Sequence, residues 1–265
     1  MDYIINNESF LRLSAFITMV ILIFIVELLF PISVRSIKPY KRWFINFFFV
    51  FMNTLILRLL FPILAVSFAA ICIKYNIGLF NYFNINLIVA IILSFLFLDF
   101  GMWLQHLLFH HVPFFWRFHK IHHSDEEVDF TTGIRFHPIE IIISMMYKFI
   151  LIAIIGPSIA LVIIFEIILN ASSIFNHGNI KIKDKYDSML RRLIVTPNMH
   201  RIHHSVEEYE TNSNFGFNFS FWDKMFGTYK SKSTKGDNLI LGLEEFKNNK
   251  DKNIFTLMFK PFSNK

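Results

Sequence analysis

Long apolar segments constrain this chain more than any other feature of its sequence. Four regions are apolar enough to cross a bilayer, and they run from Phe10 to Val34, from Trp43 to Cys72, from Asn86 to His110 and from Ile139 to Phe175. One helical crossing needs about 20 mostly apolar residues. Gly156-Pro157 interrupts the fourth region, so we expect a helical hairpin there that enters and leaves on one side. The first region lacks a basic leader and a small-residue cleavage site, which favours a retained helix over a signal peptide.

The composition agrees with a membrane protein. Hydrophobic residues make up 54% of the 265 positions and charged residues only 17%, whereas about 25% charged is usual in soluble domains. The single cysteine, Cys72, excludes a disulfide framework and a thiolate zinc site. We therefore expect an all-α, multi-pass membrane protein with residues 1–265 in a single embedded domain.

Basic residues predict the orientation of this domain in the membrane. They follow the first, third and fourth apolar regions and comprise Arg35, Lys38, Lys41 and Arg42, then Arg117, Lys120 and Arg135, then Lys181, Lys183, Lys185, Arg191 and Arg192. The loop between the second and third regions has only Lys74, and the first ten residues have no base. The positive-inside rule therefore predicts an N-terminus outside, with the loops rich in basic residues and the C-terminus in the cytoplasm.

The net charge of +6 needs no nucleic-acid partner, because topology and lipid headgroups account for it and no compact basic fold accompanies it. The tail after about Lys230 is polar except for a short apolar stretch near Phe255 to Phe262. We expect this stretch to lie on the membrane surface.

Histidine is confined to one part of the chain. All eleven histidines lie between His106 and His204. His106 and His110 form H-x-x-x-H, and two H-x-x-H-H clusters consist of His119, His122 and His123 and of His200, His203 and His204. Residues at i, i+3 and i+4 share one helix face, so each cluster aims at least two imidazoles at one point. Neutral imidazole binds iron, zinc, copper and nickel. Eight or more nitrogens exceed what one such ion uses, so we expect two metals.

The remaining histidines differ in their surroundings. His137 precedes Pro138 and His177 lies in Asn-His-Gly-Asn, and both are predicted further ligands. His111 follows His110 directly and would point off the shared face, so it is not predicted to bind metal. The topology places the predicted ligands together at the cytoplasmic face, in a helical cap.

Metal-bound histidines usually donate their other N–H to a carboxylate, a carbonyl or water. Four polar residues are predicted to support the ligands in this way, and they are Asp99, Asn176, Asn179 and Asn214. Asp99 lies about two turns before His106 inside an apolar run, where an unpaired charge is costly.

Two stretches resemble a known family. Asp99 to Ser124 reads DFGMWLQHLLFHHVPFFWRFHKIHHS, and Thr196 to Tyr229 reads TPNMHRIHHSVEEYETNSNFGFNFSFWDKMFGTY. Both closely resemble the fatty acid hydroxylase and sterol desaturase superfamily of integral-membrane oxygenases. RFHPIE at Arg135 to Glu140 and NHGN at Asn176 to Asn179 also fall where that family has similar segments. The resemblance covers roughly residues 90–230.

The resemblance implies a function and a cofactor. It implies a di-iron centre with histidine ligands, dioxygen as co-substrate, and hydroxylation or desaturation of a lipid or sterol-like C–H bond. Carried over, the three-box pattern comprises His106, His110, His119, His122, His123, His200, His203 and His204, with His177 as the additional histidine and His137 as a further ligand. The chain has no H-P-G-G haem segment and no cysteine cluster, so an external electron donor of the b-type cytochrome or ferredoxin type is expected. Zinc can replace iron as a purification artefact.

Two other functions are compatible with a histidine-rich membrane site. A zinc-dependent membrane hydrolase would normally use three protein ligands and an acid–base carboxylate, as in H-E-x-x-H, which does not occur here. A divalent-metal transporter would hold its ions near the bilayer midplane on interrupted helices. The histidines are expected instead at one membrane edge.

Overall fold

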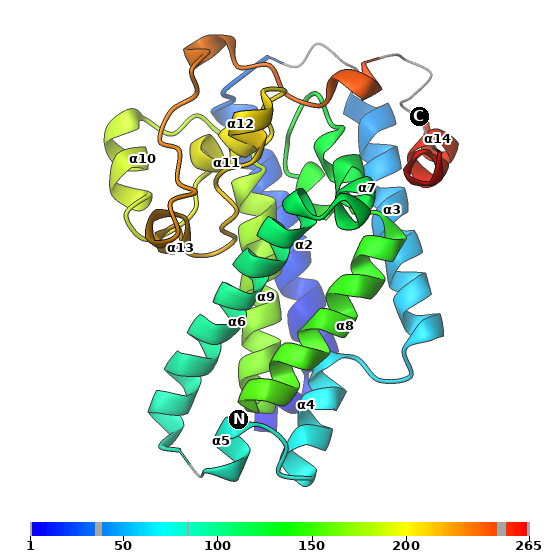
Figure 1. Ribbon diagram of the computed structural model, residues 1–265, viewed down its shortest axis with the longest axis vertical. Helices are drawn as coiled ribbons and strands as arrows, with labels where there is room; N and C mark the ends of the chain where they lie inside the picture. The colour runs from blue at the N-terminus through cyan, green and yellow to red at the C-terminus, as the bar shows by residue number, and fades with distance from the viewer. Residues whose placement is uncertain (1, 35–38, 84, 248–252, 264–265) are drawn as a thin grey trace.

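The computed structural model describes residues 2–34, 39–83, 85–247 and 253–263, and these ranges are dominated by α-helices (Figure 1). Within these ranges, β-pairing is limited to isolated bridges, such as the one between Pro31 and Ile180. The predicted all-α fold is therefore confirmed. Arg35 and Lys38, which contributed to the predicted orientation, lie outside the described residues.

A bundle of long helices forms one part of the molecule. It consists of α2 (Glu8–Leu29), α3 (Pro39–Leu60), α4 (Ala65–Lys74), α6 (Leu87–His111), α8 (Pro138–Ile155) and α9 (Ile159–Asn176), with the short α1 (Asp2–Asn6) and α5 (Leu79–Tyr82) at the end away from the cap (Figure 1). Pro62 follows the end of α3 and separates it from α4, because proline cannot continue a helix without losing a backbone hydrogen bond.

Five segments among the described residues are long and apolar enough to cross a membrane, and they are Glu8–Leu29, Pro39–Tyr82, Leu87–His111, Pro138–Ile155 and Ile159–Asn176. The predicted hairpin at the fourth apolar region is present as α8 and α9. Gly156 ends α8 in the left-handed conformation, with φ 69°, and Ser158 caps α9 by accepting a hydrogen bond from the backbone N–H of Leu161.

A buried carboxylate inside the bundle is paired with two basic side chains. Glu166 on α9 is buried and accepts hydrogen bonds from Arg12 on α2, at 2.8 Å, and from Lys148 on α8. Because an unpaired charge is costly within a membrane, this triad favours the observed packing of α2 and α8 against α9.

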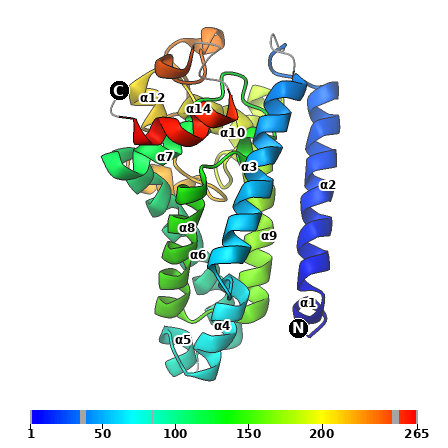
Figure 2. The ribbon, with the colours of Figure 1, turned by 90° about the vertical axis from the view of Figure 1, so that its right-hand side faces the viewer.

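Shorter helices and loops form a cap at the other end of the bundle (Figure 1). They comprise α7 (Pro113–His123), α10 (Asp184–Leu190), α11 (Pro197–His203), α12 (Glu208–Thr211), α13 (Phe221–Met225), α14 (Ile254–Phe259) and the 3₁₀ turns Thr132–Ile134, Gly236–Asn238, Glu244–Phe246 and Lys260–Phe262. Figure 2 shows α7 and α14 lying across the long axis of the bundle. The side of the membrane that the cap faces stays a prediction from the basic residues.

Candidate metal centre

Four separate elements bring histidines to the junction between bundle and cap. His106 and His110 lie in the last turns of α6, and His177 directly follows α9. The first triplet ends α7, and the second triplet occupies α11 and its C-cap. Because the ends of two apolar helices and two cap helices meet here, the histidines are buried at the membrane edge of the cap.

Nine histidines gather in two groups. The five-histidine group consists of His106, His110, His119, His123 and His203, and the four-histidine group consists of His122, His177, His200 and His204. Within each group, one ligand atom per residue lies within 4.8 Å of those of the others. The groups adjoin, since the stacked rings of His123 and His204 have centroids 4.4 Å apart. Two adjacent ions could therefore be held, with five and four nitrogen ligands.

Hydrogen bonds to the outer ring nitrogens fix the tautomers of six of these histidines. Each Nδ1 faces an oxygen, and the pairs are His106 with the Phe215 carbonyl, His110 with Asn212 Oδ1, His119 with Glu140 Oε1, His122 with the Arg135 carbonyl, His177 with the Ser173 carbonyl and His203 with the Ser213 carbonyl. A carbonyl or carboxylate oxygen can only accept, so Nδ1 carries the proton. The Nε2 lone pair of each ring then points into the cluster.

The inward nitrogens are arranged for a cation. Nε2 of His106 lies 3.1 Å from Nε2 of His119, and Nε2 of His122 lies 3.0 Å from Nε2 of His177. With both Nδ1 atoms protonated, each pair brings two lone pairs together in a buried place. The Nε2 atoms of His110, His203 and His204 are also buried without a hydrogen-bond partner. Such orphaned acceptors are costly in a protein interior, and a bound metal ion at each group would satisfy them.

Burial keeps the rings neutral. It lowers the pKa of His119 to about 3 and the pKa of His177 to about 4. The pKa of His123 is also lowered, first by burial and then by the neighbouring histidines. Neutral imidazole is the form that binds a metal, so the histidines of both groups can bind metal at neutral pH without first losing a proton.

The structure does not bring His137 to either group. Its Nδ1 accepts a hydrogen bond from the backbone N–H of Ile139, and its Nε2 donates to the carbonyl of Met258 at 3.1 Å. The ring therefore caps α8 and holds the C-terminal segment. His111, which was not predicted to bind metal, is exposed, and its Nδ1 donates to the Leu107 carbonyl.

The four predicted supporting residues lie around the centre, and in the described part of the chain none of them hydrogen-bonds a histidine. Asp99 accepts from Asn218 and Trp222, which ties α6 to the segment around α13. Asn176 donates to the Phe217 carbonyl, and Asn179 donates to the carbonyl of Ser33, four residues after the last residue of α2.

Asn214 supports the centre through the backbone. It adopts a left-handed conformation with φ 55°, and its amide donates to the carbonyls of Met199 and Lys230. These bonds hold the loop whose Ser213 and Phe215 carbonyls accept from His203 and His106. Asp223 fixes the same loop by accepting from the backbone N–H groups of Phe215 and Gly216.

The direct hydrogen-bond partners of the histidines were not among the residues predicted to support them. Glu140 is the carboxylate that accepts from His119, and its signal was the RFHPIE segment that it ends. Asn212 accepts from His110. The other four partners are backbone carbonyls, and a carbonyl occurs at every residue, so no sequence pattern marks them.

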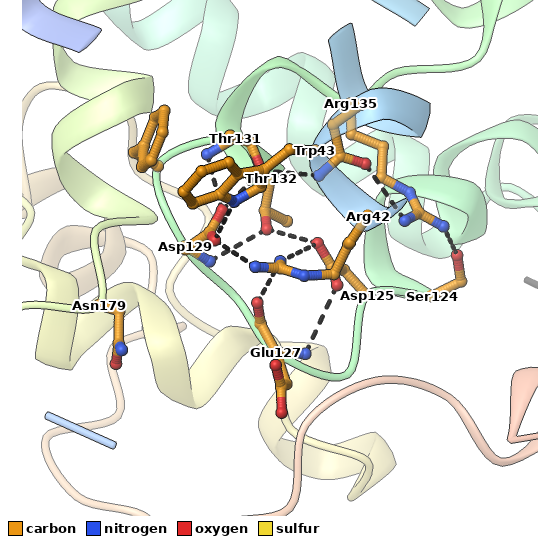
Figure 3. A network of polar contacts seen from close by, with 12 residues as sticks. Arg42, Trp43, Ser124, Asp125, Glu127, Asp129, Thr131, Thr132, Arg135 and Asn179 are labelled. Atoms are coloured by element: carbon orange, nitrogen blue, oxygen red, sulfur yellow. Dashed lines mark hydrogen bonds and ion pairs between the residues drawn. The ribbon is translucent and has the colours of Figure 1, made fainter. Parts of the chain in front are cut away.

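A buried polar network supports the first triplet from the side of α3 (Figure 3). Arg42 lies between Asp125, at 2.9 Å, and Asp129, with which it also forms an ion pair. Burial alone would raise the pKa of Asp125, but the charges of Arg42 and Arg135 hold it below its usual value. Thr132 donates to the same Asp125 carboxylate.

Arg135 links this network to the metal centre. Its side chain donates to the Ile121 carbonyl at 3.0 Å, near the end of α7. It also donates to Oγ of Ser124, the residue after α7, at 2.6 Å (Figure 3). Its own carbonyl accepts from Nδ1 of His122. The Arg135 side chain therefore fixes residues 121–124, and the Arg135 carbonyl orients the ring of His122 within the same segment.

Spanning helices, a cap and two buried groups of neutral histidines define an integral-membrane protein with a candidate dimetal site. Residues 91–228 match the fatty acid hydroxylase family model, and the chain belongs to this family. The matched region contains all nine histidines of the two groups. No solved structure matches the chain.

Several curated relatives match about half of the chain. Alkylglycerol monooxygenase of Caenorhabditis elegans is 34% identical over 51% of this chain and 26% of its own length. The Homo sapiens alkylglycerol monooxygenase is 28% identical over 54% of this chain and 31% of its own length. The ornithine lipid hydroxylase OlsE of Rhizobium tropici is 28% identical over 52% of this chain and 41% of its own length. The chain thus covers less than half the length of these relatives.

Proposed function

We propose that this protein is a dioxygen-dependent di-iron oxygenase that hydroxylates, or desaturates, a C–H bond of a membrane lipid. The observation that carries the proposal is the burial of nine neutral histidines in groups of five and four where apolar helices end. Family membership and the lipid-hydroxylating relatives support the same reaction class.

Unactivated C–H bonds are too strong and too weakly acidic for a side-chain acid or base, so redox chemistry is needed. Two bound irons would supply that chemistry with dioxygen. Hydroxylation places one oxygen atom in the product and reduces the other to water, which requires two electrons and two protons. We propose that a separate redox protein of the b-type cytochrome or ferredoxin type supplies the electrons.

The residues of this chain hold the irons and set their surroundings. All nine histidines are proposed ligands, with His137 left to its capping role. Glu140 orients His119, and the carbonyl of Arg135 orients His122. The rings of buried Phe215 and partly buried Phe217, with centroids 5.6 Å and 5.1 Å from that of His106, limit the access of water to this side of the centre.

The depth of the metal centre in the membrane suggests which part of a lipid substrate is oxidised. His110 lies one residue before the end of α6, and His177 follows the last residue of α9. Both helices are candidate spans, so their ends lie near the headgroup boundary. A lipid anchored by its headgroup brings the first carbons of its chain to this depth. We therefore propose that the oxidised carbon lies near the headgroup, in a substrate class that includes polar membrane lipids.

The test combines metal analysis with lipid analysis. Cells that express the protein or its His177→Ala variant are grown under isotopically labelled dioxygen, and their lipid extracts are compared by mass spectrometry. We expect two irons per chain and a lipid that carries one labelled oxygen only with the unaltered protein. For a confirmed hydroxylation, product oxygen derived from water, or activity in a metal-free protein, would contradict the proposal.

A zinc hydrolase and a metal transporter predict different results in the same system. A zinc hydrolase would consume no dioxygen when a reductant and lipid are added. A transporter would take metal into vesicles. The position of the centre at the end of the bundle, with up to five nitrogens for one ion, favours the oxygenase over both.

A further inference from the structure

Exposed phenylalanine side chains gather on α7 and on the C-terminal segment. Phe114, Phe255, Phe259 and Phe262 are 55%, 78%, 64% and 55% exposed, and we refer to them as the phenylalanine patch. The last three follow one another at spacings of four and three residues, so they share one side of α14 and the turn after it. Large apolar side chains grouped in this way usually mark an interaction surface.

The opposite side of the C-terminal segment is firmly packed. Leu257 is 1% exposed and belongs to a core cluster with Phe49 of α3 and Ile121 of α7. The carbonyl of Met258 accepts the hydrogen bond from His137. The segment is therefore held against the bundle by one face, and its phenylalanines are directed outward by that packing.

One buried ring joins the two parts of the patch. Phe118 on α7 contacts Phe114 with ring centroids 5.5 Å apart and contacts Phe262 with centroids 5.8 Å apart. The patch is thus continuous from α7 to the C-terminal segment.

The patch adjoins the ends of spanning helices. α6 ends at His111, and Phe114 follows three residues later. α8 begins at Pro138, and the ring of His137 before it lies 6.1 Å from that of Phe262. Figure 2 shows α7 and α14 lying across the bundle at this level. Helices that lie in the plane of a membrane interface have this orientation and carry their apolar side chains on one face.

We propose that the phenylalanine patch is buried among lipid acyl chains just beneath the headgroups of the membrane that the bundle crosses. Its position beside the ends of α6 and α8 makes lipid the occupant, since both helices are long and apolar enough to cross the membrane and the patch lies where they end. α7 then lies between lipid and metal centre, because its other face carries His119, His122 and His123. The patch would fix the depth of the centre in the membrane. The inference rests on the spanning helices and not on the oxygenase reaction.

Site-directed spin labelling tests this placement. Cys72, the single native cysteine, is replaced by alanine, and single cysteines are introduced as Phe255→Cys, Phe259→Cys and Phe262→Cys. The full chain is labelled in phosphatidylcholine nanodiscs, and collisions with oxygen and with a water-soluble nickel chelate are measured. Lys232→Cys, at an exposed position of a cap loop, is the matched control. Monodispersity and the melting temperature of each variant verify folding.

We expect oxygen collisions to dominate at the three phenylalanine positions and nickel collisions to dominate at position 232. Nickel-dominated collisions at all four positions would place the patch in water and overturn the proposal. Labels shielded from both reagents at the phenylalanine positions would also overturn it, because protein would then cover the patch.

Discussion

Nδ1 of His119 donates a hydrogen bond of 2.7 Å to Oε1 of Glu140, and both side chains are buried. Within the described residues this is the one contact between a carboxylate and a histidine of the two groups. The other fixed rings donate to neutral oxygens, such as the carbonyls of Phe215 and Arg135. A carboxylate partner fixes the tautomer and raises the basicity of the ring as a ligand. The five-histidine group therefore has a carboxyl partner that the four-histidine group lacks.

Replacing Glu140 should weaken metal binding. We expect Glu140→Ala to lower metal affinity by roughly 10–100-fold, the usual effect of losing the partner of a metal-bound histidine. Glu140→Gln keeps an oxygen acceptor and should lose less. Competition with a chelator, followed by metal analysis, measures both. Equal affinity in all three proteins would show that this contact does not support a ligand.

Removing one ligand of the four-histidine group should cause the loss of one bound metal ion. We expect His177→Ala to reduce the bound metal from two ions to one per chain and to abolish lipid oxidation, because the group keeps only three histidines. His111→Ala is the control, since His111 is exposed and lies outside both groups. Metal content per chain is the measurement. Loss of metal from the His111 variant, or two ions in the His177 variant, would contradict the assignment.

Replacing His137 separates a capping histidine from a ligand. We expect His137→Ala to retain two metals while the protein loses about 1 kcal/mol of stability, as is typical for the loss of a helix N-cap. His137→Asn can still accept from the N–H of Ile139 and should recover part of that loss. Metal analysis and melting in detergent distinguish the roles. A missing metal ion in the alanine variant would return His137 to the ligand set.

Arg42 should be required for stability because it pairs with two buried carboxylates. We expect Arg42→Met to destabilise the protein by about 3–5 kcal/mol, since Asp125 and Asp129 would keep buried charges without their partner. Adding Asp125→Asn and Asp129→Asn should restore part of the loss.

Arg58→Met, at an exposed position on the same helix, is the matched control and should change stability little. The melting temperature in detergent compares these proteins. A melting temperature of the Arg42 variant equal to that of the control would show that the network contributes no stability.

The ligand candidates were readable from the sequence because they are local patterns on helices. Spacings of three and four residues place His106 beside His110 and His119 beside His122 and His123, whatever the rest of the fold does. His137 looked similar in the sequence because it also stands at a helix boundary next to family-like residues. Its ring instead accepts a hydrogen bond from the N–H of Ile139 and donates one to the carbonyl of Met258, which is 121 residues further along the chain.

For the supporting residues too, local sequence indicated the residue, but only the fold showed its partner. Asp99 was expected to support the ligands, since a carboxylate in an apolar helix is costly without a partner. Its partners, Asn218 and Trp222, lie more than a hundred residues further along the chain. Glu140 stood in a quoted motif, but its direction toward His119 depends on how α8 meets α7.

Sequence alone determined that the chain forms apolar helices, where the hairpin turns and which imidazoles can act together, because hydropathy and helical periodicity are properties of neighbouring residues. Tertiary structure decided how nine histidines divide into groups of five and four and which oxygen orients each fixed ring. Those features depend on contacts between distant segments, such as His106 with the Phe215 carbonyl, and such contacts form only when the helices pack.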